Sequence, residues 1–140
     1  MRNFSHILAP LTFLVFITTG CATQLPPVNF SVPNVGPSNI KLDAELKSIT
    51  VSPARPDEAT GIINWRVENI TVAWKNALEE AFNKMAIFKD DSPKKVSLSV
   101  KVLNYYPSGF AEVTAHTSAR YEIIDRSNGA IIFTTDVSST

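Results

Sequence analysis

The sequence predicts an α+β domain with a two-layer arrangement, in which one amphipathic helix packs on a mainly antiparallel sheet. Three observations predict this fold class. Apolar residues recur every three or four positions over one long segment, 67–88, which indicates a helix. Apolar and polar residues alternate over the segments before and after it, which indicates strands with one buried face. The order of these segments is β-α-β-β-β.

The first twenty residues have the organisation of a secretory signal peptide. Arg2 supplies the positive charge of a short leading segment, and residues 7–17 form an apolar run. This run is shorter than the roughly 20 residues that a membrane-spanning helix needs. We therefore expect the segment 1–20 to direct export and then to be removed.

The residues around Cys21 indicate which kind of export signal this is. Thr-Thr-Gly-Cys resembles the lipobox of bacterial lipoproteins, with Thr18 where an aliphatic residue is usual. The resemblance implies cleavage between Gly20 and Cys21 and a diacylglyceryl group on the Cys21 thiol, with acyl chains such as palmitate holding the protein to the membrane. Ala22 after the cysteine implies sorting to the outer membrane, facing the periplasm. The alternative is an ordinary signal cut after Ala22, which would release the protein.

A Pro-rich segment separates the leader from the rest of the chain. Residues 21–38 contain four prolines with Asn, Ser and Gly between them, and their apolar residues follow no period. Such a composition favours an extended, semi-rigid chain. We predict that 21–38 is the lipidated N-terminus and tether of a domain formed by 39–140.

The first strand of this domain is predicted from alternation that begins near residue 40. The apolar positions are Ile40, Leu42, Ala44 and Leu46. The phase slips at Ser48, after which Ile49 and Val51 continue the apolar face. A β-bulge, or a division into two short strands, would explain this slip. An exposed loop is expected over 52–60, which holds two prolines and two acids.

The helix is predicted from a continuous apolar stripe. Its members are Val67, Ile70, Trp74, Leu78, Ala81, Met85 and Phe88. Trp74 belongs to this stripe, so we expect it in the core. Asn64 or Asn69 could cap the start of the helix. The run 90–93 is expected to end it, because Pro93 cannot continue a helix.

Three further strands follow in succession. Alternation predicts them over 96–102, 111–123 and 131–137. We expect a turn at 106–109 and a hairpin at 125–129, where Asn-Gly is a strong turn signal. The chain stops at Thr140, directly after a strand. We expect a further C-terminal helix in the native family, which this chain would lack.

The composition excludes several classes of function. The net charge is +0 and no basic run exists, so nucleic acid is not an expected partner. No phosphate-binding glycine motif is present, and a single cysteine cannot form an intrachain disulfide. His116 is the only histidine beyond the leader, which predicts no metal site and no cofactor.

Two places in the domain are candidates for function. His116 could form a hydrolase site with Ser118 and Glu112, but strand neighbours two apart are poorly placed for contact between nucleophile and base. We therefore expect a solvated histidine and a protein that is not an enzyme. Tyr105 and Tyr106 lie at a predicted strand end, where amphipathic rings suit either a contact with a partner or the covering of a turn.

These features in this order resemble small Gram-negative outer-membrane lipoproteins with an α+β domain, such as YajG-type lipoproteins and the auxiliary lipoproteins of lipid-transport ABC systems. The resemblance rests on the leader, the helix around 74–80, and the strands 96–104 and 113–124. It implies a lipid-anchored, non-enzymatic cell-envelope protein that binds a protein or lipid partner in envelope maintenance or transport. The alternatives are a periplasmic hydrolase centred on His116 and a structural or vestigial lipoprotein.

Overall fold

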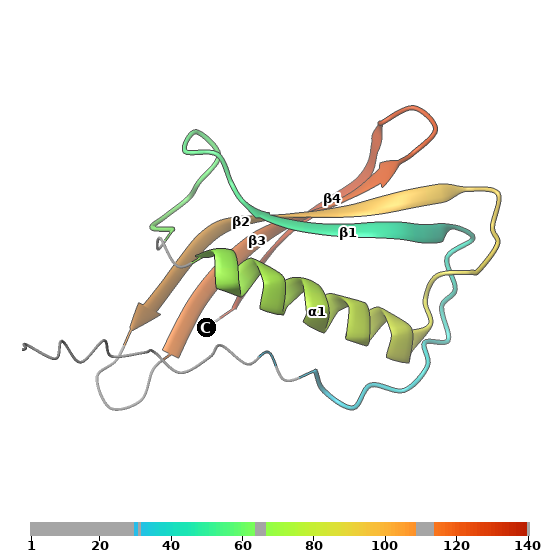
Figure 1. Cartoon of the computed structure of the whole chain (residues 1–140), viewed down its shortest axis with the longest axis horizontal. Helices are drawn as coiled ribbons and strands as arrows, with labels where there is room; N and C mark the ends of the chain where they lie inside the picture. Colours follow the sequence, from blue (N-terminus) through green and yellow to red (C-terminus); the bar gives the residue numbers. More distant parts are fainter. Residues whose placement is uncertain (1–29, 31, 64–66, 109–113, 140) are drawn as a thin grey trace, which may run out of the picture.

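The computed structural model of the chain describes residues 30, 32–63, 67–108 and 114–139, and these form an α+β fold (Figure 1). The predicted element order β-α-β-β-β is confirmed. The elements are β1 (Glu45–Pro53), α1 (Val67–Met85), β2 (Lys95–Ser108), β3 (Thr114–Asp125) and β4 (Ile131–Ser139). The predicted signal peptide, Gly20, Cys21 and most of the tether lie outside the described residues, as do Asn64 and Glu112.

The four strands form one mixed sheet in the order β1-β2-β3-β4. β2 pairs with β3 and β3 with β4 in antiparallel fashion, as predicted. β1 pairs with β2 in parallel. The parallel pair arises because the chain crosses over through α1 between the two strands, and a helical crossover returns the chain in the same direction.

β1 begins later than its alternation predicted. Glu45 is its first residue, and Leu42 forms only an isolated bridge to Phe88. The predicted bulge is confirmed, because the pairing with β2 shifts between Leu46 and Ser48. After the bulge Ile49 returns to the buried face.

α1 ends at Met85, so the predicted end at 90–93 is wrong. Ala86 adopts a left-handed conformation with φ 46°, which terminates the helix before Phe88 is reached. The Lys41 ammonium donates to the Ala86 carbonyl, where a cation complements the negative end of the helix. Phe88 instead turns back and packs edge-on against Phe82, with 5.4 Å between ring centroids. Asn69 lies inside α1 and therefore does not cap it.

α1 packs against the apolar face of the sheet (Figure 1). Its contributing side chains are Trp74, Leu78 and Phe82. They contact a buried cluster from β1, β2 and β3, made of Ile49, Leu98, Val100 and Ala119. The predicted core position of Trp74 is confirmed, and its indole Nε1 donates to the Tyr121 hydroxyl at 3.1 Å.

β2 continues through the residues expected to form a turn. It runs to Ser108, which pairs with Thr114 of β3, so the predicted turn at 106–109 is wrong for the described residues. Pro107 is tolerated because β1 pairs with β2 only as far as Val102. Beyond Val102 no residue of β1 pairs with β2, so the backbone N–H that Pro107 lacks is not needed for a hydrogen bond to β1. The predicted hairpin is confirmed, with Gly129 at φ 73°.

Candidate apolar binding site

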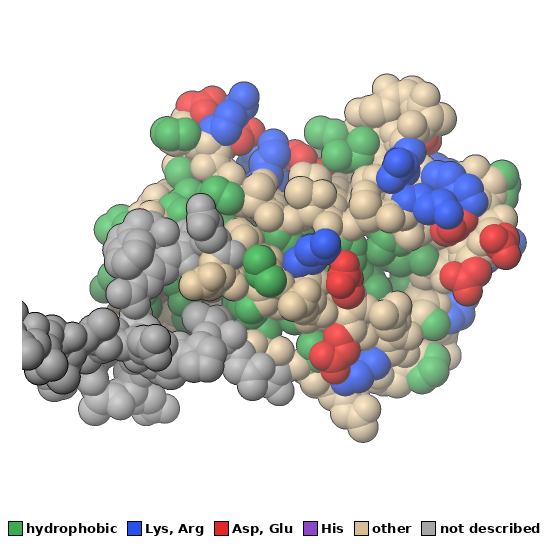
Figure 2. Space-filling view, in the orientation of Figure 1, with side chains coloured by type: hydrophobic (Ala, Val, Ile, Leu, Met, Phe, Trp, Pro, Cys, Tyr) green, Lys and Arg blue, Asp and Glu red, His purple; other side chains and the backbone are tan. Residues whose placement is uncertain are grey.

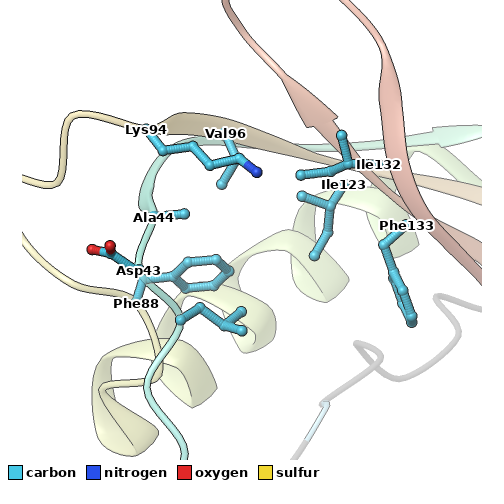
Figure 3. Close-up of a pocket in the computed structure, with 9 residues that line it drawn as sticks. Asp43, Ala44, Phe88, Lys94, Val96, Ile123, Ile132 and Phe133 are labelled. Atoms are coloured by element: carbon cyan, nitrogen blue, oxygen red, sulfur yellow. The ribbon is translucent and has the colours of Figure 1, made fainter.

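An apolar hollow of about 430 Å³ opens at the end of the sheet where α1 stops (Figure 3). Its walls come from the segment before β1, the turn after α1, and strands β2 to β4. The lining residues are Leu42, Asp43, Ala44, Phe88, Lys94, Val96, Ile123, Ile132 and Phe133. Seven of these nine side chains are apolar, so the hollow offers almost no hydrogen-bonding groups to an occupant.

Phe88, which the sequence placed on the helix, lines the hollow from the segment that follows α1. α1 ends at Met85, and the chain then returns through Phe88 toward β2. Among the described residues, no helix covers Phe133 of β4, and this side chain stays 53% exposed. Figure 3 shows Ile123 and Phe133 across the hollow from Phe88. The lining thus combines the buried Ala44 and Val96 with the exposed Ile132 and Phe133.

Two charged residues stand at the rim of the hollow. The Asp43 carboxylate accepts from the Lys89 ammonium at 3.2 Å and from the Ser92 hydroxyl at 3.3 Å. Lys94 forms no ion pair within the part of the chain that the structure describes. Its side chain extends over Val96 toward Ile132 in Figure 3. The Lys94 ammonium also acts electrostatically on the Asp125 carboxylate, whose pKa is lowered mainly by hydrogen bonds from Ser127 and also by Lys94.

The opposite, polar face of the sheet carries a network of paired charges. The Lys101 ammonium contacts Glu58 at 3.1 Å and Glu122 at 3.7 Å. The Arg120 guanidinium forms two hydrogen bonds to Asp136, at 2.8 and 3.0 Å. These bonds hold the pKa of Asp136 below its ordinary value, and they raise that of Arg120. These charges are therefore paired with one another on the surface of the sheet.

Sequence reasoning missed this network, although one signal for it was available. Alternation places Lys101 on the polar face of its strand, and it places Arg120 and Glu122 on the polar face of the next. The antiparallel register then pairs Lys101 with Arg120. The contribution of Glu58 could not be foreseen, because the loop predicted over 52–60 folds back onto the sheet.

His116 contacts a different serine from Ser118, the one considered from the sequence. Its Nε2 lies 3.1 Å from the Ser108 hydroxyl, and its ring stacks on Tyr106 with 5.7 Å between centroids. Ser118 instead lies 3.4 Å from the Thr60 hydroxyl. Glu112, the third member of the arrangement considered from the sequence, lies outside the described residues.

The two tyrosines of the predicted contact patch have different environments. Tyr105 is 7% exposed and packs with Ile70 and Val102, so it cannot serve as a surface contact. Tyr106 is 46% exposed and remains available. Successive side chains of a strand point to opposite faces, which is why Tyr105 is buried and Tyr106 is exposed.

The described residues contain neither a metal cluster nor a membrane-spanning helix. No three His, Cys, Asp or Glu side chains among them gather closely enough to hold a metal ion. None of the helical structure described combines the length and apolarity needed to cross a bilayer. Figure 2 shows positive and negative side chains intermixed on the visible face, without a patch of one sign.

Comparison with known proteins finds similarity only at the level of solved structures. No family model and no curated protein matches the chain. Protein XCC0632 of Xanthomonas campestris, from family DUF330, has a TM-score of 0.49 and 14% identity, covering 81% of this chain and 74% of its own. The PelC dodecamer of Paraburkholderia phytofirmans has a TM-score of 0.44 and 14% identity, covering 76% and 77%. At these values the similarities carry no argument about the function of this chain.

Proposed function

We propose that this protein is a non-enzymatic lipoprotein of the cell envelope, anchored through lipid on Cys21, whose domain binds a protein or lipid partner. The leader and the Thr-Thr-Gly-Cys sequence support the anchor, and Ala22 supports the outer membrane, facing the periplasm. The proposal includes a two-layer domain of helix on sheet, held off the bilayer by the Pro-rich tether. The family proposed from the sequence, the YajG-type and ABC-transport auxiliary lipoproteins, belongs to the same hypothesis.

The apolar hollow is the observation that carries the binding proposal. Its volume of about 430 Å³ falls within the range of ligand pockets, roughly 300–1,000 Å³. Exposed apolar surface is costly to leave in water, and contiguous patches of it mark interaction sites. Ile132 and Phe133 extend this surface from the hollow onto β4. An apolar group of a partner would bury these side chains, and Lys94 would favour a neighbouring negative charge.

A hydrolase remains the second candidate, on one observation. Ser108 and His116 lie within hydrogen-bonding distance, as a nucleophile and its base must. No described carboxylate hydrogen-bonds to the His116 ring, so the group that would orient the base is missing from this part of the chain. If a hydrolytic activity is found, Ser108→Ala and His116→Ala should each abolish it, and full activity in either variant would exclude this site.

The anchor is tested by metabolic labelling with radioactive palmitate. The parent chain should incorporate label, and Cys21→Ser should abolish it, because the thiol is the acceptor. Ala22→Ser is the matched control, since it alters the neighbouring residue and keeps the thiol. Equal labelling of Cys21→Ser and the parent would exclude a lipid on Cys21.

The hollow is tested by placing a photo-crosslinking phenylalanine analogue at Phe88 in living cells. This position lines the hollow, and the analogue keeps an aromatic ring there. We expect an adduct with an envelope protein or a phospholipid. The same analogue at Lys75, on the exposed side of α1, serves as control. No adduct from Phe88, or equal adducts from both positions, would argue against binding in the hollow.

A further inference from the structure

Within the part of the chain that the structure describes, the outer edge of β4 has no partner strand. β4 is the last strand of the sheet, and every one of its residues is exposed. β3 pairs with one side of β4. No described residue forms backbone hydrogen bonds along the other side. An edge strand presents a row of free backbone donors and acceptors, which is a template for another strand.

The two edge strands of this sheet, β1 and β4, differ in whether they carry features that prevent pairing with another strand. β1 carries an exposed lysine, Lys47, together with a terminal proline, Pro53, and a bulge between Leu46 and Ser48. Lysines, prolines and bulges are the devices by which edge strands avoid association. β4 contains neither lysine nor proline, and its one irregularity lies at its start, beside Ile131.

The charge on β4 is already neutralised within its own sheet. Asp136 is the only charged residue of the strand, and Arg120 of β3 holds it by two hydrogen bonds. The rest of the strand is made of Ile, Phe, Thr, Val and Ser. β-branched and aromatic residues favour strand pairing. An approaching strand would therefore meet a neutral edge with high β-propensity.

We infer that β4 pairs with β4 of a second copy of this chain, in antiparallel fashion about a two-fold axis at Thr135. This inference goes beyond the proposed function and does not depend on the lipid anchor. The join would extend the four-stranded sheet of one copy into that of the other. A two-fold axis makes the same edge complementary to itself, as closed dimers require.

The register follows from the sequence of β4. Centring on Thr135 pairs all nine residues of the strand and places Phe133 opposite Val137 of the copy. These two side chains are 53% and 49% exposed on the helix-bearing face, so their contact buries apolar surface. Centring one residue later would place Asp136 opposite itself, which like charges disfavour. The chosen register places Asp136 opposite Thr134.

Cross-linking of introduced cysteines tests this register. The full chain is purified in detergent in a Cys21→Ser background, so that the introduced thiol is the only one. Thr135→Cys should form a covalent dimer on oxidation, because facing residues of an antiparallel pair lie about 4.5–5.5 Å apart. Ser139→Cys is the matched control on the same strand. Its two copies would lie about 27 Å apart, at about 3.4 Å per residue, and should not cross-link.

Sedimentation of uncross-linked protein tests the interface itself. The parent chain should sediment as a dimer. Thr135→Lys should weaken the dimer by about ten-fold or more, because two ammonium groups would face each other at the axis. Thr50→Lys, on the exposed surface of β1, should leave the dimer intact. A monomeric parent, a dimer insensitive to Thr135→Lys, or equal cross-linking from Ser139→Cys would each overturn the inference.

Discussion

Replacing Val100 with alanine tests the central packing of α1 on the sheet. Val100 has no exposed surface, and its neighbours across the sheet are Val51 in β1 and Tyr121 in β3. The side chain belongs to the cluster that Trp74 and Leu78 cover. Its burial therefore depends on the packing of α1 against the sheet.

The expected cost follows from the two methyl groups removed. Each buried carbon contributes about 0.8 kcal/mol of transfer free energy, and the cavity left behind adds to this. We expect Val100→Ala to lower the free energy of unfolding by about 2–3 kcal/mol. Val137→Ala is the matched control, because Val137 is half exposed on β4 and no described helix covers it. That change should cost about 0.5 kcal/mol.

Urea denaturation followed by circular dichroism measures both variants. A low protein concentration keeps any association through β4 from contributing to the measured stability. An unchanged slope with urea would show that each substitution alters stability rather than the unfolded state. Equal costs for Val100→Ala and Val137→Ala would refute the reasoning, because they would mean that β4 is buried as deeply as β2.

Two further predictions concern single side chains. Because Arg120 lowers the pKa of Asp136 below its usual 3.8, the folded state gains stability from this pair above that pH, and loses it as the pH falls through the lower, folded pKa. Asp136→Asn should therefore flatten the dependence of the unfolding free energy on pH below 3.8, and an unchanged acid dependence would contradict this. Gly129→Ala should destabilise the β3–β4 hairpin by about 1–2 kcal/mol in thermal unfolding, because φ is 73° there. Gly36→Ala is the control, because Gly36 has open space around it and no positive φ. A similar loss of stability in both variants would refute the explanation.

The strands and helix were predictable because their signals are local. A period of two indicates a strand and a period near 3.6 a helix, whatever lies elsewhere in the chain. The bulge near Ser48 was also predictable, since one extra residue shifts the phase of alternation. The hairpin at Gly129 followed from the turn chemistry of Asn-Gly.

The errors arose where a contact distant in sequence replaced the local pattern. The stripe continued to Phe88, but the chain leaves the helix at Ala86, so that Phe88 packs on Phe82 and bridges to Leu42. Tyr105 was expected at an exposed strand end, yet β2 runs past it. The described segment before α1 lies along β2 there, and the backbone N–H of Tyr105 donates to the Ile62 carbonyl at 3.0 Å.

The sequence by itself determined the order and type of the elements and which face of each strand is apolar, while the lipobox-like motif at Cys21 stays a prediction. Each of these depends on neighbouring residues, whose periodicity and chemistry are printed in the chain. Only the tertiary structure decided the parallel pairing of β1 and β2, the pairing of Arg120 with Asp136, and the apolar hollow between Phe88 and Phe133. These depend on where a helix ends and on which strands become neighbours, and packing free energy summed over the whole domain decides both.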